Sequence, residues 1–376
     1  MLVLYICATS ASRRYATSIR RGVINPPFLT PEVLFFIIFF TFVFAIRYNV
    51  GVDYPGYLEL YESGYKLEYD KNEFLFKHIS LFFYNIGAHP IFYFGFFVFV
   101  QITVFLFALK NEKYIYPFLV IFLFCNGEVN QWMNIIRSAT AMCIWLYSIK
   151  FVEKKQFWKY LIFILLAAGI HRSALLYVVI YPFLNFKEIK RPFISFQVIL
   201  LTVAFVIRKL FTVFSSRLIP LITFIQATLG GENDYYKNYD YAAMMEDLNK
   251  GVSGTGIAFL AKLMIDIAII LYSNKLHSFY NSRRFNLLYV LFIIALFFFY
   301  CFPASVISFS RPFRFFFVLR TVMLAFFTYY LWRNKKNAQN QLVLYSTIII
   351  YLGLFVLAQV VCNADACLWY QTWFNQ

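Results

Sequence analysis

Long apolar stretches recur along the whole of this 376-residue chain, and short polar connections separate them. A straight transmembrane helix needs about 20 apolar residues, so each stretch is a candidate span. Several stretches are shorter than that, which predicts tilted, broken or re-entrant helices. The pattern places spans at 33–46, 90–109, 115–126, 134–149, 157–168, 173–185, 193–207, 256–273, 285–302, 312–332 and 341–361.

The first ten residues, MLVLYICATS, are apolar but too short to cross a membrane alone. A basic segment follows them, whereas a cleavable signal peptide has its basic residues first. We therefore expect an all-α polytopic integral membrane protein with 11 or 12 transmembrane or half-length helices. Residues 1–32 are expected to form a stunted helix and a basic cytoplasmic segment, and residues 33–376 a single transmembrane domain.

Composition supports the membrane assignment. Hydrophobic residues make up 61% of the chain and charged residues only 14%, with 49 Phe and 29 Tyr. A water-soluble fold cannot bury this much apolar surface without exposing large apolar patches. Soluble enzymes, disordered tails and collagen-like chains are therefore excluded.

The net charge of +16 follows the predicted topology. With the N-terminal arginines placed in the cytoplasm, the cytoplasmic segments hold 19 basic and four acidic residues, a net of +15. The opposite side holds 13 of each sign. This asymmetry is the positive-inside rule of membrane proteins, so the charge requires no nucleic-acid partner.

The same topology leaves two long extracytoplasmic loops, at about 47–89 and 208–255. Within the first, the stripe of Phe76, Ile79 and Phe83 predicts a helix that lies flat at the outer interface. The second loop carries several tyrosines among acidic residues. Their rings suit the stacking of sugars, and they equally suit an aromatic belt at the membrane interface. They are Tyr235, Tyr236, Tyr239 and Tyr241.

Ionisable residues at the outer ends of spans are the candidate functional groups, because charges near the bilayer usually face a cavity or a partner. They are Arg47, Arg137, His171, Arg172, Arg311 and Arg314. For each one alone, snorkelling to headgroups or a local salt bridge is the structural alternative. Gathered on one membrane face, they favour a bound pyrophosphate or other polyanion, because arginine supplies permanently charged, bidentate donors.

Other ionisable and sulfur-bearing residues suggest structure rather than chemistry. Lys262 and Asp266, four apart in one span, are expected to neutralise each other. Cys362 and Cys367 fall together on the oxidising face, which leaves a disulfide between them open. The sequence has no metal-ligand spacing, Gly-rich phosphate loop or Ser-His-Asp pattern. We therefore expect no metal and no cofactor.

Five segments carry a family resemblance, and they occur in this order: RYNVGVDYPGYLELYE, NEFLFKHIS, NIIRSATAMCIWLYSI, LLAAGIHRSALLYVVIYPFL and SRPFRFFFVLR. Through these five segments, the chain resembles the EpsG-like branch of bacterial Wzy-type polysaccharide polymerases over roughly 45–376. The matching residues are Arg47, Gly51, Asp53 and Tyr57; Glu73, Leu75 and Phe76; Asn134, Arg137 and Ala141; His171, Ser173 and Ala174; and Arg311, Phe315 and Phe316. Val52, Phe74 and the stunted first helix depart from the family's pattern.

The resemblance implies a membrane glycosyltransferase in the bacterial cytoplasmic (inner) membrane, with its site on the extracytoplasmic side. Its substrates would be oligosaccharide repeat units on polyprenyl pyrophosphate, which it joins into a surface polysaccharide such as an O-antigen, capsule or exopolysaccharide. Energy would come from the sugar–pyrophosphate bond, so no nucleotide is required. Implied partners are the lipid-linked oligosaccharide, membrane lipid, a flippase and a chain-length regulator.

The resemblance also implies residue roles. Substrate-binding residues would be Arg47, Arg137, Arg172, Arg311, Arg314, Glu73 and Tyr57. The arginines would stabilise the charge that develops on the leaving pyrophosphate. Asp53 would be the base for the acceptor hydroxyl, with His171 as the alternative, and an ion pair with Arg47 is the structural alternative for Asp53.

Two other functions remain open at this point. A lipid-linked oligosaccharide flippase or other transporter would also need a basic cavity, although its charges should extend to the cytoplasmic half. A polysaccharide ligase would use the same donor as a polymerase.

Overall fold

The computed structural model describes residues 1–65, 73–185, 192–210, 256–302, 311–361 and 370–374. Helices account for most of these residues, and the described ranges contain no strand, only an isolated antiparallel bridge between Arg47 and Thr372. The chain is therefore an all-α polytopic membrane protein, as the sequence predicts. The tyrosines at 235–241 and the pair Cys362 and Cys367 lie outside the described residues.

The chain divides into two compact units. The first comprises Met1–Ile189, Ser282–Leu287 and Thr321–Gln376, and the second comprises Lys190–Asn281 and Leu288–Arg320. The single transmembrane domain expected for 33–376 stays a prediction.

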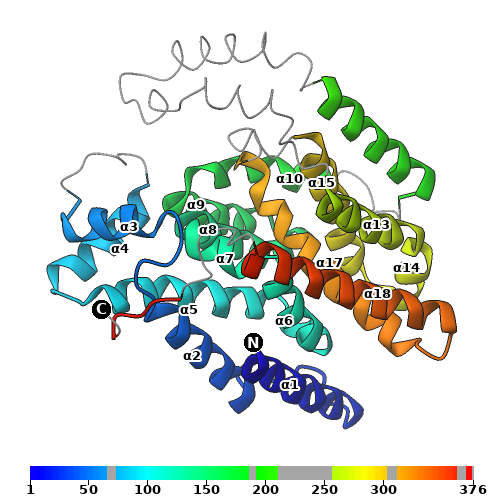
Figure 1. Ribbon diagram of the computed structural model, residues 1–376, viewed down its shortest axis with the longest axis horizontal. Helices are drawn as coiled ribbons and strands as arrows, with labels where there is room; N and C mark the ends of the chain where they lie inside the picture. Colours follow the sequence, from blue (N-terminus) through cyan, green and yellow to red (C-terminus); the bar gives the residue numbers. More distant parts are fainter. Residues whose placement is uncertain (66–72, 186–191, 211–255, 303–310, 362–369, 375–376) are drawn as a thin grey trace. The chain divides into compact units, whose positions relative to one another are not determined.

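The first unit holds most of the helices (Figure 1). In chain order they are α1 (Leu2–Arg20), α2 (Pro31–Ala45), α3 (Tyr54–Glu62), α4 (Phe74–Asn85), α5 (Pro90–Ala108), η1 (Lys110–Ile115), α6 (Tyr116–Cys125), α7 (Glu128–Asn134), α8 (Ile136–Glu153), α9 (Phe157–Ile170), η2 (Arg172–Val179), α10 (Ile180–Asn185), α18 (Ala338–Phe355) and the π-helical η4 (Val356–Val361). Two further helices, α15 (Arg283–Cys301) and α17 (Arg314–Arg333), contribute residues to both units.

The N-terminal segment differs from the expectation. Residues 2–20 form one continuous helix instead of a stunted helix followed by a basic segment. Leu4, Ala8 and Ala11 are buried at intervals of four and three residues, so one narrow face of α1 packs against α2 and α6. Arg13 and Arg14 lie outside this contact face and are exposed. Because no basic side chain has to be buried, the helix can continue through the basic stretch.

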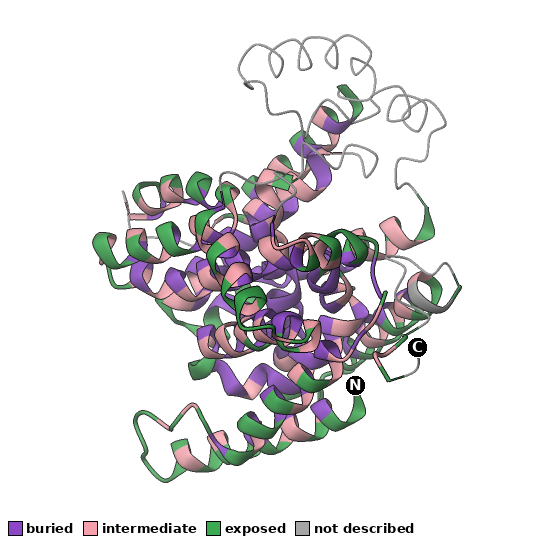
Figure 2. Ribbon diagram, turned by 90° about the vertical axis from the view of Figure 1, so that its left-hand side faces the viewer, coloured by how far each residue is buried: buried purple, intermediate pink, exposed green. Residues whose placement is uncertain are grey.

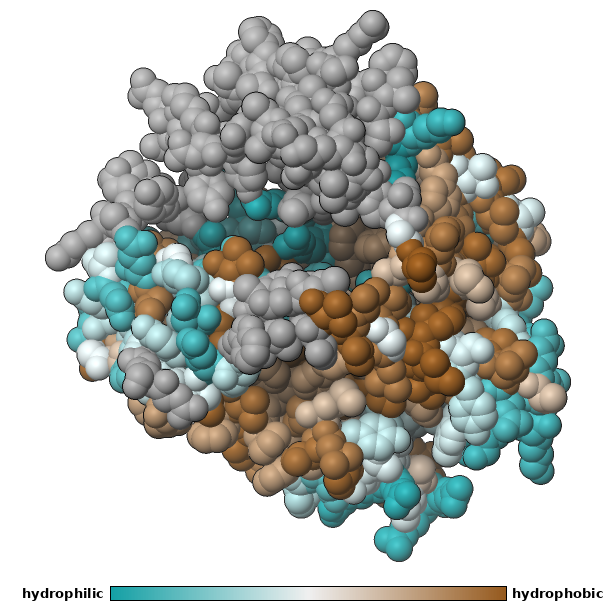
Figure 3. All heavy atoms as spheres, viewed as in Figure 1, coloured by the Kyte–Doolittle hydropathy of each residue, from teal (hydrophilic) through white to brown (hydrophobic). Residues whose placement is uncertain are grey.

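Helix α2 shows how the membrane helices are built. Pro31 occupies its first turn, where proline's missing N–H costs no hydrogen bond. Phe36 and Phe40 are buried, whereas Phe35 and Phe42 on the other side are exposed. A helix that is apolar all round and half exposed suits contact with lipid. Figure 2 shows buried and exposed residues side by side along the helices, and in Figure 3 hydrophobic residues cover broad areas of the face shown.

Four helices in the described ranges are long and apolar enough to cross a membrane. They are Pro90–Ala108, Arg283–Cys301, Arg311–Arg333 and Ala338–Ala358. A fifth candidate is the pair α13 (Ile257–Leu271) and α14 (Ser273–Tyr280), which is bent by 57°. The shorter predicted spans also correspond to helices, α2 and α9 among them. The count of 11 or 12 membrane segments itself stays a prediction.

The break expected at AAGIHRSALL is present. Helix α9 ends at Ile170, and His171 adopts an extended backbone with φ −150° and ψ 113°. The chain then continues as the 3₁₀ helix η2 and the short helix α10. His171 therefore stands between two half-length helices, as the sequence predicts.

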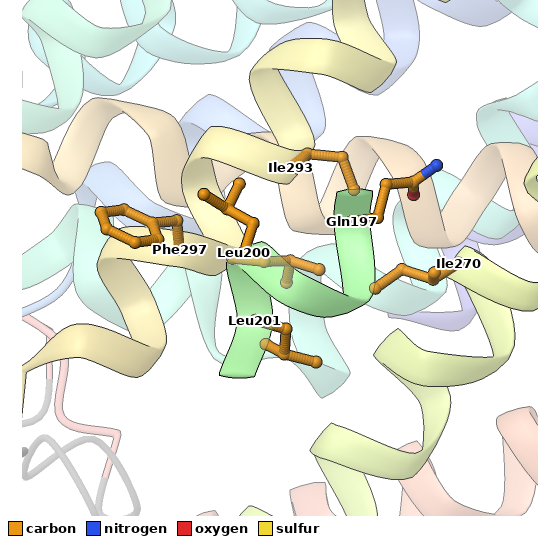
Figure 4. A pocket seen from close by; sticks show the side chains of 7 residues that line it. Gln197, Leu200, Leu201, Ile270, Ile293 and Phe297 are labelled. Carbon is orange, nitrogen blue, oxygen red and sulfur yellow. The ribbon is translucent and has the colours of Figure 1, made fainter. Parts of the chain in front are cut away.

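The second unit contains the helix at 194–210, α13, α14, the 3₁₀ helix η3 (Arg311–Phe313) and parts of α15 and α17. A small, mostly apolar pocket lies between three of these helices. It is lined by Gln197 and by the apolar side chains of Leu200, Leu201, Ile270, Ile293, Leu296 and Phe297. Figure 4 labels all of these except Leu296. The Gln197 side chain is engaged by protein groups: it accepts a hydrogen bond from Tyr289 at 2.7 Å and donates one to the Pro192 carbonyl at 2.8 Å.

The buried carboxylate of this unit, Asp266, has two partners that the sequence did not suggest. Arg320 donates two hydrogen bonds to Asp266, from Nε at 3.1 Å and from Nη2 at 2.6 Å, and Tyr300 donates a third at 2.6 Å. The positive charge of Lys262 also acts on Asp266, and its share in neutralising the carboxylate stays a prediction. A guanidinium on another helix offers the planar fork that a carboxylate binds best, which a lysine on the same helix does not.

Candidate functional site

Glu73 is the centre of the charged site in the first unit. Its Oε2 accepts a hydrogen bond from Arg137 Nη1 at 2.8 Å, and its Oε1 accepts one from His171 Nδ1 at 2.6 Å. The backbone N–H of Arg172 also donates to Oε1, at 3.3 Å. Glu73 is only 5% exposed, so its negative charge is balanced almost entirely by these protein groups.

The site forms where three helices meet. Glu73 directly precedes α4, Arg137 lies in the first turn of α8, and His171 directly follows α9. Helix α9 packs against both α4 and α8 (Figure 1). Residues far apart in the sequence therefore meet at neighbouring helix ends.

Gly169 permits the close approach of α9 to α4. A Cβ at this position would lie 2.9 Å from Cβ of Leu75, closer than two such atoms normally come. Leu75 follows Glu73 by two residues, and His171 follows Gly169 by two residues. The absent side chain therefore lets the two helices carry Glu73 and His171 to within hydrogen-bonding distance.

Two aromatic rings contact the Arg137 side chain. Its guanidinium carbon lies 5.7 Å from the centroid of the Tyr57 ring and 5.6 Å from that of Phe76. Both distances are within the range of cation–π attraction. The two rings lie next to each other, with centroids 6.2 Å apart, and both contact the guanidinium that binds Glu73. The Arg137 side chain remains 21% exposed.

Tyr57 is a neutral neighbour of this charged group. Burial raises the pKa of Tyr57, and the positive charge of Arg137 acts in the opposite direction. Asp53 and Glu73 add to the increase. The phenol therefore stays protonated at neutral pH and is a hydrogen-bond donor beside Arg137.

Arg47 has a different setting from Arg137. It is fully buried, and it donates hydrogen bonds to the carbonyls of Phe44 and Met133, both at 3.2 Å. The rings of Tyr54 and Phe94 lie on its guanidinium at 5.6 and 5.3 Å. These contacts join the end of α2 to α7, which is a structural role. Substrate binding by Arg47 stays a prediction.

The remaining predicted residues are distributed as follows. Asp53 is exposed at the start of α3, one turn before Tyr57. Arg172 contributes its backbone to the site, and its side chain is exposed. Arg311 is exposed and Arg314 is half-buried, and both belong to the second unit. A cavity shared by all six basic residues therefore stays a prediction.

A segment near the end of the sequence supports the loop that carries Arg47. The N–H of Tyr48 donates to the Gln371 carbonyl at 2.9 Å, and the N–H of Trp373 donates to the Ile46 carbonyl at 3.0 Å. The Trp373 ring packs edge-on against Tyr48. Figure 1 shows this segment in red beside the loop that follows α2. Sequence reasoning missed the pairing, and the aromatic ending WYQTWF was the only signal for it.

The next part of the same loop contacts the junction between α7 and α8. Gly51 has a φ of +103°, and a Cβ on it would lie 2.4 Å from Oδ1 of Asn134. Only glycine fits this position without movement of Asn134. The loop therefore packs against Asn134, which lies three residues before Arg137 in the sequence.

The fold and the site define a multi-pass membrane protein whose helix ends carry a buried carboxylate bound to a histidine and an arginine. The chain matches the EpsG family over residues 33–373, and it belongs to that family. No curated protein and no solved structure matches it. Family membership supports a polysaccharide-polymerase type of function in a bacterial membrane.

Proposed function

We propose that this chain is a membrane glycosyltransferase that polymerises oligosaccharide repeat units carried on polyprenyl pyrophosphate, on the extracytoplasmic side of the bacterial cytoplasmic membrane. The observation that carries the proposal is the binding of His171 and Arg137 to one buried carboxylate, Glu73. This arrangement offers a base and a permanent positive charge within one site. Family membership supports the polymerase type of function.

His171 is better placed than Asp53 to act as the base. With its Nδ1–H donated to Glu73, the proton acceptor of the imidazole is Nε2. A carboxylate on Nδ1 also stabilises the imidazolium that forms when Nε2 takes a proton. Asp53 lies exposed at the start of α3, where water screens its charge. We therefore assign the proton transfer from the acceptor hydroxyl to His171.

Arg137 is assigned to the leaving group. As the bond between the anomeric carbon and the pyrophosphate oxygen breaks, negative charge increases on that oxygen. A guanidinium held in place by two rings and a carboxylate needs little reorganisation to stabilise this charge. The partly exposed Arg137 can meet a ligand, whereas the fully buried Arg47 is bound to backbone carbonyls.

The reaction balances without a cofactor. The acceptor oxygen forms the new glycosidic bond, its proton passes to His171 Nε2, and polyprenyl pyrophosphate leaves with the electron pair of the broken bond. The energy is that of the sugar–pyrophosphate bond. A flippase upstream and a chain-length regulator remain the proposed protein partners.

A flippase would transport the same lipid without breaking a bond, and it would not require the Glu73–His171 pair. A ligase would use the same donor and the same chemistry with a different acceptor. The site geometry therefore favours a transferase, and the family favours the polymerase among transferases.

A deletion strain tests the proposal. Its surface glycans are separated by length and compared with those of the strain complemented by the wild-type chain or by His171→Gln. Loss of a polymerase leaves single repeats on the surface acceptor. Lipid-linked polymer that stays unattached would instead show a ligase, and absence of both products would show a flippase. Full-length polymer with His171→Gln would contradict the assigned base.

A further inference from the structure

Five lysines gather at the end of α8 opposite Arg137. They are Lys110, Lys150, Lys154, Lys155 and Lys159. Lys150 lies within electrostatic reach of Lys110, Lys154 and Lys159. Thirteen positions separate Arg137 from Lys150 along α8, which corresponds to about 20 Å at the rise of an α-helix. This lysine cluster is therefore separate from the Glu73 site.

Aromatic rings hold two of these ammonium groups in place. Lys150 Nζ lies 3.5 Å from the centroid of the Tyr147 ring, and Lys110 Nζ lies 4.9 Å from that of Phe107. The two rings are themselves stacked at 5.3 Å. Cation–π contacts fix the positions of the ammonium groups without removing their charge.

The nearby carboxylates do not neutralise the lysines, because both are bound to Arg284. Its Nε donates to Glu112 at 2.9 Å, and its Nη1 lies 3.6 Å from Glu153. Among the residues that the structure describes, none of the five lysines forms an ion pair with a carboxylate. Their positive charge is therefore available to an anion from outside the chain.

An exposed apolar stripe begins beside these lysines. Trp158, Ile162 and Leu165 lie on one face of α9 and are 73%, 55% and 54% exposed. Lys159 follows Trp158 directly, in the first turn of the same helix. The surface thus has a cationic end and an apolar stripe about two helical turns long. Such a surface is complementary to an amphiphile with a negatively charged head group.

We propose that the lysine cluster and the α9 stripe together bind an anionic phospholipid, with the phosphate at the lysines and an acyl chain along Trp158, Ile162 and Leu165. A free phosphate ion would use the lysines and leave the stripe unused. The site is independent of the proposed polymerase activity. Each lysine near the membrane surface contributes about fivefold in affinity for an anionic lipid.

Native mass spectrometry of the purified full-length protein tests the proposed binding of an anionic phospholipid. The detergent-solubilised chain is titrated with phosphatidylglycerol and with phosphatidylcholine of identical acyl chains. The variant is Lys154→Gln/Lys159→Gln, because both side chains are exposed and their removal leaves the core intact. The matched control is Lys335→Gln/Lys336→Gln, two exposed lysines between α17 and α18.

The wild type and the control should retain phosphatidylglycerol in preference to phosphatidylcholine. The Lys154→Gln/Lys159→Gln variant should bind phosphatidylglycerol about 25-fold more weakly. Equal affinity for the two lipids, or an equal loss in the control, would overturn the proposal. Circular dichroism and a monodisperse elution profile confirm that each variant is folded.

A second variant separates a lipid from a phosphate ion. Trp158→Ser/Ile162→Ser should weaken the binding of phosphatidylglycerol and leave the binding of glycerol phosphate unchanged. If this variant binds phosphatidylglycerol as the wild type does, or if millimolar inorganic phosphate displaces the lipid completely, the site binds the phosphate group alone.

Discussion

Glu73 and His171 are joined by a 2.6 Å hydrogen bond although 98 residues separate them in the chain. The bond links the residue that precedes α4 to the residue that follows α9, and Arg137 at the start of α8 completes the contact. The three side chains thus depend on the mutual packing of three helix ends. A change in any of these helix positions therefore moves both the histidine and the arginine relative to Glu73.

The first prediction distinguishes the two candidate bases. His171→Gln should lower the rate of polymerisation about 10²–10⁴-fold, the usual contribution of a positioned base. Asp53→Asn should retain most of the wild-type rate, because Asp53 is exposed and outside the contacts of Glu73. The measurement is polymer length and yield in the deletion strain, at matched protein amounts in the membrane. Loss of polymer with Asp53→Asn alone would assign the base to Asp53.

The second prediction concerns Glu73 as a positioning residue. In Glu73→Gln the side-chain amide keeps only one acceptor oxygen, which can accept from either Arg137 or His171. The NH₂ group then faces the donor of the other residue, so one of the two hydrogen bonds is lost. We expect loss of long polymer and a decrease of about 1–3 kcal/mol in the free energy of unfolding. Glu62→Gln, on the exposed side of α3, is the matched control and should behave as the wild type. A change in the pH profile of the rate would separate an effect on His171 from simple destabilisation.

The third prediction tests the geometry of Arg137. Arg137→Lys keeps the positive charge and loses the planar guanidinium, which binds Glu73 and under the proposed function would bind a phosphate at the same time. The rate should decrease about 10²–10³-fold, as for the loss of one donor to a developing charge. Arg333→Lys, at the exposed end of α17, serves as the control. Normal polymer from Arg137→Lys would show that charge alone is sufficient and that the fork has no role.

The fourth prediction concerns stability in the second unit. Arg320→Gln leaves the buried carboxylate of Asp266 without its charge partner, which should cost about 3–5 kcal/mol. Lys262→Gln should cost much less, because Arg320 supplies the bidentate contact. Thermal unfolding of the detergent-solubilised variants, followed by size-exclusion chromatography, measures both. Equal destabilisation by the two variants would restore Lys262 as a main partner of Asp266.

The fifth prediction is that the end of α4 and the end of α8 lie on opposite sides of the membrane. In a background without native cysteines, Asn85→Cys should react with a membrane-impermeant maleimide in intact cells. Lys155→Cys should react only after permeabilisation, because the positive-inside distribution places it in the cytoplasm. Both positions are exposed. The reverse result would move the Glu73 site to the cytoplasmic side and remove its access to exported substrate.

The helices and the break at His171 could be predicted because both are local properties of the sequence. Apolar runs define spans, and a histidine between two half-length apolar runs marks an interruption. The grouping of Glu73, Arg137 and His171 could be anticipated from the ordered motifs of the resemblance. The hydrogen bonds among them could not, because they depend on how closely α9 approaches α4 at Gly169.

Long-range partners were beyond sequence reasoning. The i, i+4 spacing of Lys262 and Asp266 is visible in the sequence, whereas Arg320 lies 54 residues from Asp266 on another helix. Arg47 shows the same limitation. An arginine at the end of a span suggests an exposed ligand, yet packing of α7 and the rings of Tyr54 and Phe94 encloses it completely.

The pairing of residues 46–48 with residues 371–373 has a consequence for biosynthesis. Ribosomes extend the chain from the N-terminus, so the loop that carries Arg47 is made more than 300 residues before the segment that braces it. During synthesis, this loop has no partner until the intervening helices have been made. A chain that is terminated before Thr372 would thus keep these helices but lack the segment that pairs with residues 46–48.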